Sequence, residues 1–264
     1  MFTRAGDLIV AYDLHGPADA PVLVLANSLG TSMHVWDDVV APLATTYRVL
    51  RYDMRGHGLS GDTRLDSEDG VNLLADDLAD LLGALGISRA SIAGLSIGGM
   101  IAQRAAVRHA QHVEAIVLLG TGNRLRTRAV WNERIATVER DGVNGVVEGV
   151  LSGWFTPQTH AERPELIAGF ATMLRRTPAA GYVFGCRAVR DADLRADDAA
   201  IRCPALVIAG SADPVAPPST GIEMREAIPG ARMVVIDDAA HIIPAERPHE
   251  TAEAIRRFLD EVKT

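Results

Sequence analysis

The sequence has few cysteines, no cluster of positive charge and no long apolar run, and each absence excludes a class of protein. Its two cysteines, Cys186 and Cys203, form no Cys-x-x-Cys pair, and neither adjoins a histidine. A disulfide framework or a thiolate metal site is therefore not expected. The 34 acidic residues outnumber the 26 lysines and arginines, giving a formal net charge of -8. The basic residues are scattered, so we expect no nucleic-acid partner.

No apolar run approaches the about 20 residues that span a membrane. Residues 1–7 lack the basic start and apolar core of a secretory signal. We therefore expect no membrane partner and a cytoplasmic location. What is present is an ordinary globular composition, 48% hydrophobic and 23% charged over 264 residues. That length suits one large α/β domain with a modest insertion.

Short apolar runs alternate with helical patterns along much of the chain. Apolar runs predict strands at residues 7–12, 21–26, 47–53, 91–94, 113–120, 205–210 and 231–236, and helical spacing covers residues 70–85, 101–109, 221–227 and 248–262. Continuous apolar runs are typical of strands that are buried on both faces. The alternation predicts an α/β fold, a mostly parallel sheet with helices on both faces.

This alternation stops after Gly120. Helical patterns alone follow at residues 130–138, 143–154, 164–174 and 179–189. We interpret residues 123–198 as a helical cap inserted between two parts of an α/β core, residues 1–122 and 199–264. Aromatic side chains gather in this segment, where they could line a substrate pocket or form the small core of the insertion.

Residues 94–98 read Gly-Leu-Ser-Ile-Gly, between an apolar run and a helical pattern. Glycines two positions before and after Ser96 permit a sharp strand-to-helix turn that presents the serine hydroxyl. The turn also places the amide of Ile97 at a helix start, where unpaired N–H groups favour negative charge. We predict Ser96 as a nucleophile and Ile97 as an oxyanion donor. The alternative is a glycine-rich turn with an ordinary serine.

A serine nucleophile needs an adjacent base, and the base needs a carboxylate to orient it. Asp213 and His241 each follow a predicted strand, at the edge where open α/β sheets assemble their sites. The chain order Ser96, Asp213, His241 is that expected of an α/β-hydrolase. We therefore predict these three residues as a catalytic triad.

Other residues compete for two of these roles. His57 lies in a tight loop between two glycines and precedes the nucleophile, so it is the weaker candidate base. Asp237 and Asp238 are closer to His241 in sequence than Asp213 is. We expect these two aspartates to serve in the turn.

A second oxyanion donor is expected in the loop that leaves the strand at residues 21–26. Residues 27–30 read Asn-Ser-Leu-Gly, and we assign the donor to the backbone N–H of Leu29. The alternative is a turn that uses Asn27 and Gly30 for their tolerance of positive φ.

Over essentially its whole length the chain resembles the α/β-hydrolase superfamily. Within it, residues 25–31, 51–58, 94–101 and 190–195 are similar to 3-oxoadipate enol-lactonases, as are residues 122–124, 131–135 and 154–157. The Asn-Ser-Leu-Gly loop is the most specific feature, because many relatives carry His-Gly there.

The resemblance implies hydrolysis of 3-oxoadipate enol-lactone, a small molecule, in the β-ketoadipate pathway of aromatic catabolism. Ser96 would attack the lactone carbonyl while His241 takes its proton and the amides of Leu29 and Ile97 hold the oxyanion. It implies no metal and no organic cofactor. The alternative is a broad-specificity carboxylesterase or a cofactor-free perhydrolase on the same scaffold; a non-catalytic receptor is a further alternative.

The implied substrate carries a carboxylate, so an acidic protein must offer a local cation. Candidates are Arg124, Arg134 and Arg187, because a guanidinium fork suits carboxylate recognition. Trp131 and Trp154 could wall the pocket. Each of these five residues could instead be a surface or packing residue.

Overall fold

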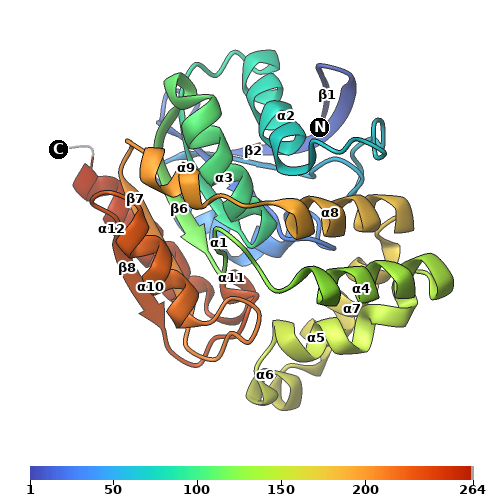
Figure 1. The fold of residues 1–264 in the computed structure, drawn as a ribbon. Coiled ribbons are helices and arrows are strands. Elements are labelled where there is room, and N and C mark those ends of the chain that lie inside the picture. The colour runs from blue at the N-terminus through green and yellow to red at the C-terminus, as the bar shows by residue number, and fades with distance from the viewer. Residues whose placement is uncertain (263–264) are drawn as a thin grey trace.

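The computed structural model describes residues 1–262, and its centre is an eight-stranded sheet of order β1-β2-β4-β3-β5-β6-β7-β8 (Figure 1). The strands are β1 (Phe2–Ala5), β2 (Leu8–His15), β3 (Val22–Ala26), β4 (Arg48–Tyr52), β5 (Ala90–Leu95), β6 (Val113–Leu119), β7 (Ala205–Gly210) and β8 (Arg232–Ile236). Pairing is antiparallel from β1 to β4 and parallel from β4 to β8. The predicted mostly parallel sheet is confirmed.

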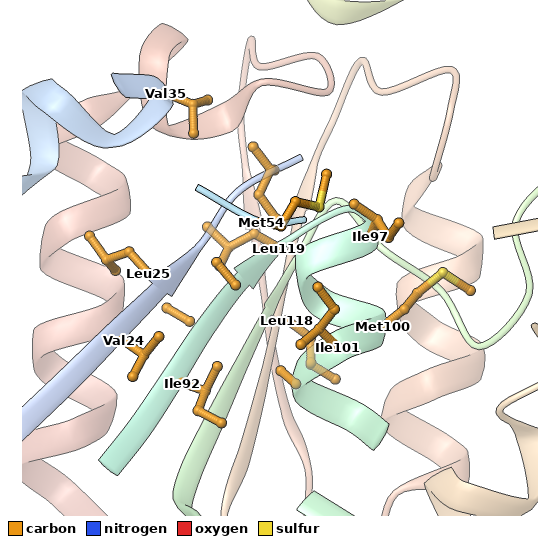
Figure 2. Close-up of a cluster of buried hydrophobic side chains, with 14 of the residues drawn as sticks. Val24, Leu25, Val35, Met54, Ile92, Ile97, Met100, Ile101, Leu118 and Leu119 are labelled. Carbon is orange, nitrogen blue, oxygen red and sulfur yellow. The ribbon is translucent and has the colours of Figure 1, made fainter. Parts of the chain in front are cut away.

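Strands β3, β5, β6 and β7 form the middle of the sheet, and nearly all their side chains are buried. Their continuous apolar sequence follows from this position, because a parallel sheet covered by helices has no solvated face. Figure 2 shows side chains of β3, β5 and β6 in one cluster with Ile97, Met100 and Ile101 of helix α3 (Ile97–Arg108). This packing fixes the helix that follows Ser96 on the sheet.

The other helices of the α/β core are α1 (Asp37–Leu43), α2 (Gly70–Ala84), α10 (Pro218–Ala227), α11 (Ile243–Glu246) and α12 (Pro248–Val262), with short 3-10 turns η1 (Met33–Trp36) and η2 (Ala110–His112). Helix α3 contacts α2, whereas α1 contacts α11 and α12. Within residues 1–262, no helix combines the length and the apolar character needed to cross a membrane.

Between β6 and β7 the described chain contains helices and no strand. These are α4 (Arg128–Asp141), η3 (Val143–Val146), α5 (Val147–Trp154), α6 (Pro157–Glu162), α7 (Pro164–Arg176), α8 (Ala179–Asp191) and α9 (Arg195–Ala200). The hydroxyls of Thr127 and Thr156 accept backbone N–H groups in the first turns of α4 and α6. In Figure 1, helices α4 to α7, green to yellow, lie together at one end of the molecule. The division at residues 123 and 198 stays a prediction.

Candidate active site

Ser96 sits on the sharp turn between β5 and α3. Its φ of 57° and ψ of -118° lie in a region that non-glycine residues rarely adopt. The flanking glycines are required sterically. A Cβ on Gly94 would lie 2.1 Å from the carbonyl oxygen of Gly98, and one on Gly98 would lie 2.3 Å from that of Ala26. The predicted strand-to-helix turn is therefore present.

The backbone of Ser96 is anchored to the end of β6 and to the chain just beyond it. Its N–H donates to the carbonyl oxygen of Leu119 at 2.9 Å. Its carbonyl oxygen accepts the hydroxyl of Thr121 at 2.7 Å. These bonds hold the turn in its strained conformation, with the serine side chain presented beyond the sheet edge.

Asp213 and His241, from the loops after β7 and β8, contact each other. Both are buried, and Nδ1 of His241 lies 2.9 Å from Oδ2 of Asp213. Oδ1 of Asp213 accepts the amides of Val215 at 2.7 Å and Ala216 at 3.1 Å.

Burial alone would raise the pKa of Asp213, but His241 and the two backbone amides outweigh it, so the pKa lies below its usual value. The ionised carboxylate requires the proton on Nδ1 of His241. Nε2 of His241 is then left with a lone pair that can accept a proton.

The competing aspartates do not contact His241. Asp238 adopts a φ of 52° and its N–H donates to the Ser211 hydroxyl. Asp237 and Asp238 are both exposed. Asp238 thus lies in a turn, as expected from the sequence.

His57, the alternative base, has both ring nitrogens engaged. Nε2 accepts the N–H of Gly30 at 3.0 Å, and Nδ1 lies 3.1 Å from the carbonyl oxygen of Arg55. Burial lowers the pKa of His57 to about 4, so the ring is neutral at neutral pH. Because Nε2 already accepts a hydrogen bond, His57 has no free lone pair for a serine proton.

Two backbone N–H groups near Ser96 have no acceptor in the described part of the protein. Ile97 is the first residue of α3, and Leu29 lies in a turn whose ends, Ser28 and Thr31, are hydrogen-bonded at 3.1 Å. Within residues 1–262, the N–H groups of Leu29 and Ile97 donate to no protein atom. Two unused donors beside a nucleophile are what an oxyanion hole requires. Their role stays a prediction.

A cavity of about 30 Å³ brings residues of the core and of the helical segment together. Its walls include Leu29, Ser96 and His241 from the core, and Arg126, Trp131, Arg134, Trp154 and Tyr182 from the segment between β6 and β7. This volume holds about two water molecules. A substrate can therefore enter only after side chains or helices of the wall move.

Arg134, a predicted carboxylate ligand, lines this cavity, and its guanidinium lies 5.0 Å from the centre of the Trp131 ring. Arg126, which the sequence analysis missed, lines it too and adopts a φ of 56°. Burial, and then the charge of Arg134, lower the pKa of Arg126, against an opposing effect of Asp213. Neither arginine forms an ion pair with a carboxylate in the described part of the chain. The cavity thus offers an anion two arginines that have no ion-pair partner among residues 1–262.

The remaining predicted contacts divide into two groups. Trp131 and Trp154 line the cavity, but they also pack: the indole N–H of Trp131 donates to Leu125, and Trp154 stands edge-on to Phe170. The structure does not bring Arg124 and Arg187 to this cavity. Both are exposed, and Arg187 donates to Glu139 on the surface at 3.1 Å.

Glu246 of α11 is a further buried polar residue that the sequence analysis missed. Its Oε1 accepts the hydroxyls of Thr156 at 2.9 Å and Thr159 at 2.6 Å, and its Oε2 accepts the N–H of Ala240. The N–H of Ile242 donates to the carbonyl oxygen of Trp154 at 3.0 Å. Both neighbours of His241 in the chain are therefore tied to the α5–α6 junction, directly or through Glu246.

The cysteines lie outside this arrangement. Both thiols are free, and burial raises the pKa of Cys186 to about 12 and that of Cys203 to about 11. No group of three His, Cys, Asp or Glu residues in the described chain is placed to hold a metal ion.

Comparison with known proteins gives one family and several similar proteins. A family model described as the alpha/beta hydrolase fold matches residues 21–248. The chain is 34% identical to 3-oxoadipate enol-lactonase 1 of Acinetobacter baylyi, over 100% of this chain and 97% of that protein. The enol-lactonase of Burkholderia xenovorans superposes with a TM-score of 0.95 at 35% identity, covering 98% of this chain and 100% of that chain. A thermophilic esterase of Thermogutta terrifontis, with malate bound, gives a TM-score of 0.90 at 27% identity, covering 97% of this chain and 95% of that chain.

Proposed function

Because this chain belongs to the α/β-hydrolase fold family, we propose that it is a carboxylic-ester hydrolase that opens a small lactone, with 3-oxoadipate enol-lactone as its substrate. One observation carries this proposal: a single cavity is lined by Ser96 and His241 and by two arginines, Arg126 and Arg134, that form no ion pair in the described part of the chain. The similar proteins named as enol-lactonases support the substrate class. The similar esterase structure contains malate, which supports binding of a small carboxylate on this scaffold.

The proposed first step is attack on the lactone carbonyl carbon by the hydroxyl oxygen of Ser96. Nε2 of His241 takes the serine proton, while Asp213 keeps Nδ1 protonated and stabilises the imidazolium. The carbonyl oxygen becomes negatively charged and receives hydrogen bonds from the amides of Leu29 and Ile97.

Collapse of this intermediate breaks the bond between the carbonyl carbon and the ring oxygen. His241 returns its proton to that oxygen, so the ring opens to an enol that stays attached to Ser96 as an ester. Water, deprotonated by His241, then hydrolyses the ester and restores the serine. Tautomerisation of the enol to a ketone draws the reaction forward. No step in this scheme uses a metal or an organic cofactor.

In this scheme the two arginines bind the free carboxylate of the substrate, and Trp131 and Trp154 enclose its carbon chain. These contacts would hold the lactone carbonyl against the Ser96 hydroxyl. Holding the two reacting groups in this geometry lowers the activation barrier and so raises kcat. The cytoplasmic location and the β-ketoadipate pathway stay predictions from the sequence.

The test is turnover of two substrates by the wild type and by Ser96→Ala. We expect Ser96→Ala to lower kcat for the enol-lactone by more than ~10⁴-fold with an unchanged thermal midpoint, since the nucleophile is lost and the fold is not. Wild-type-like turnover in this variant would refute the assigned nucleophile.

The alternative is a broad carboxylesterase or perhydrolase with the same triad, and the similar esterase favours it. The ratio of kcat/KM for the enol-lactone to kcat/KM for p-nitrophenyl acetate separates the two functions. We expect the ratio to favour the lactone strongly, because only the lactone offers a carboxylate to the arginines. A preference for the simple ester would establish the alternative instead.

A further inference from the structure

We propose that His57 is a positioning residue for the oxyanion donor Leu29, and that it acts by fixing the peptide between Leu29 and Gly30. The mechanism above leaves His57 unused, although it is buried next to the loop that carries Leu29. This inference rests on the proposed function, because it requires the Leu29 N–H to face the carbonyl oxygen of the substrate.

The loop at residues 28–31 is a hydrogen-bonded turn. The carbonyl oxygen of Ser28 accepts the N–H of Thr31 at 3.1 Å and its hydroxyl at 2.8 Å. Gly30, in the third position, has a φ of 77°, a value typical of a type II turn. A type I turn closes the same ends but rotates the central peptide by roughly 180°. The orientation of that peptide is therefore not set by the turn's own hydrogen bonds.

His57 sets it. The N–H of this central peptide belongs to Gly30 and donates to Nε2 of His57 at 3.0 Å. Rotation of the peptide would point the N–H away from His57, which is its one acceptor among the described residues, and an N–H buried without an acceptor is costly. Leu29 contributes the carbonyl half of this peptide, so the hydrogen bond to His57 restrains the ψ torsion of Leu29, the residue whose N–H is the proposed oxyanion donor.

The hydrogen bonds of His57 also determine its tautomer. Its Nδ1 faces the carbonyl oxygen of Arg55 at 3.1 Å and must carry the ring proton. Nε2 then keeps the lone pair that Gly30 requires. Nearby, Asp53 makes a second connection between the same two loops, since its carboxylate accepts the amides of Met33 at 2.7 Å and Leu59 at 2.8 Å. His57, which holds the turn through Gly30, is thus itself held in one tautomer and one position.

The opposite side of the turn is closed by the helical segment. The hydroxyl of Thr177 donates to the carbonyl oxygen of Gly30 at 3.3 Å. A Cβ on Gly30 would lie 2.6 Å from Leu174 and 2.9 Å from Tyr182. Both polar groups of Gly30 are therefore held, the N–H by His57 and the carbonyl by Thr177.

The experiment compares His57→Leu with His57→Gln. Leucine fills a similar volume without an acceptor, whereas the glutamine amide oxygen can reach the Gly30 N–H. We expect His57→Leu to lower kcat by about 10-fold to 100-fold, somewhat less than loss of a whole oxyanion donor, with KM changed less than about 2-fold. His57→Gln should recover most of the lost kcat. If His57→Leu does not fold, His57→Asn replaces it, because its shorter side chain cannot reach Gly30.

A second readout separates positioning from general stability. n-Butylboronic acid forms a tetrahedral adduct on an active serine and places an oxygen in the oxyanion hole. Its affinity should fall in His57→Leu by the same factor as kcat, while affinity for the product 3-oxoadipate stays unchanged. The control is His109→Leu, which removes a histidine hydrogen-bonded to Asp76 at 2.7 Å, outside the cavity. This control should leave kcat and boronate affinity at wild-type values.

Wild-type kcat in His57→Leu, or equal losses of boronate and product affinity, would overturn the inference. Its failure can be told apart from failure of the proposed function. Activity that persists in Ser96→Ala would contradict the proposed function. If Ser96→Ala is inactive and His57→Leu is fully active, only the proposed role of His57 is contradicted. If the lactone is not turned over, kcat is measured with p-nitrophenyl acetate, whose hydrolysis needs the same oxyanion hole.

Discussion

Arg126 and Arg134 differ from the other arginines at the surface of this protein because they line the cavity of Ser96 without a carboxylate partner among residues 1–262. We predict that Arg134→Gln and Arg126→Gln each raise KM for the enol-lactone by about 10-fold or more, since a hydrogen bond to a charged group contributes roughly 1.5–3 kcal/mol. The KM for p-nitrophenyl acetate should stay unchanged, because this ester has no carboxylate. Initial rates with both substrates give the comparison.

Arg187→Gln is the matched control. Arg187 lies on α8, but its guanidinium donates to Glu139 at the surface. Its loss should change neither KM, since exposed ion pairs contribute little. Equal changes of KM for both substrates in Arg126→Gln and Arg134→Gln would contradict carboxylate binding.

The sequence predicted some residues of the candidate site and missed others, for a physical reason. Ser96 and Asp213 follow the buried strands β5 and β7, and His241 follows the more exposed strand β8. Each of these strands is marked in the sequence by an apolar run, so it could be predicted without a structure. Arg126 lies in an irregular stretch before α4, where no periodicity says which side chain faces inward. Arg124, only two residues earlier, was predicted in its place and does not line the cavity.

The turn between β5 and α3 carries a prediction about backbone contacts. Gly98→Ala should lower the free energy of unfolding by at least about 2 kcal/mol, because the added methyl group would press on the backbone of β3. Activity should fall as well, since Ser96 moves with the turn. Urea denaturation and kcat measure the two effects.

Gly83→Ala provides the control within another helix. Gly83 lies near the end of α2, and a Cβ there would meet no atom within 4 Å. The substitution should raise the free energy of unfolding by about 0.5–1 kcal/mol, as expected for glycine to alanine in a helix. A stability for Gly98→Ala equal to that of the wild type would show that the close approach of the two backbones is not needed.

Elements with a strong pattern were predictable, and short ones were not. Strand β7 has the predicted bounds, and the final helix, α12, was predicted over the same residues. Helix α3 begins four residues before the predicted start, because Gly98 and Gly99 are poor helix formers that only the turn requires. Elements such as β1 and α11 have four residues each, too few for a period to show.

At the scale of the whole molecule, Glu246 joins the helical segment to the loop of His241. Its carboxylate is buried and accepts hydrogen bonds from Thr156 and Thr159 on one side and from Ala240 on the other. No sequence pattern could indicate this, because the threonines lie 87 and 90 residues away along the chain. Trp154, two residues before Thr156, lines the cavity of Ser96, so a movement of this wall that admits a substrate would also act on the residues that hold the loop of His241.

This coupling predicts the effect of Glu246→Gln. The amide has the shape of the carboxylate but only one acceptor oxygen, so either Ala240 or the two threonines lose their partner. We expect the free energy of unfolding to fall by about 1–3 kcal/mol, the range for a buried group left unsatisfied. The kcat should fall too, because Ala240 adjoins His241.

Glu253→Gln is the control. Glu253 is an exposed residue of α12 whose carboxylate lies 4.0 Å from His249. Its substitution should change the free energy of unfolding by less than about 0.5 kcal/mol and leave kcat unchanged. If both variants unfold at the same urea concentration, the carboxylate does not connect the helical segment to the loop of His241, and the position of His241 must be set by Asp213 and the Trp154 carbonyl alone.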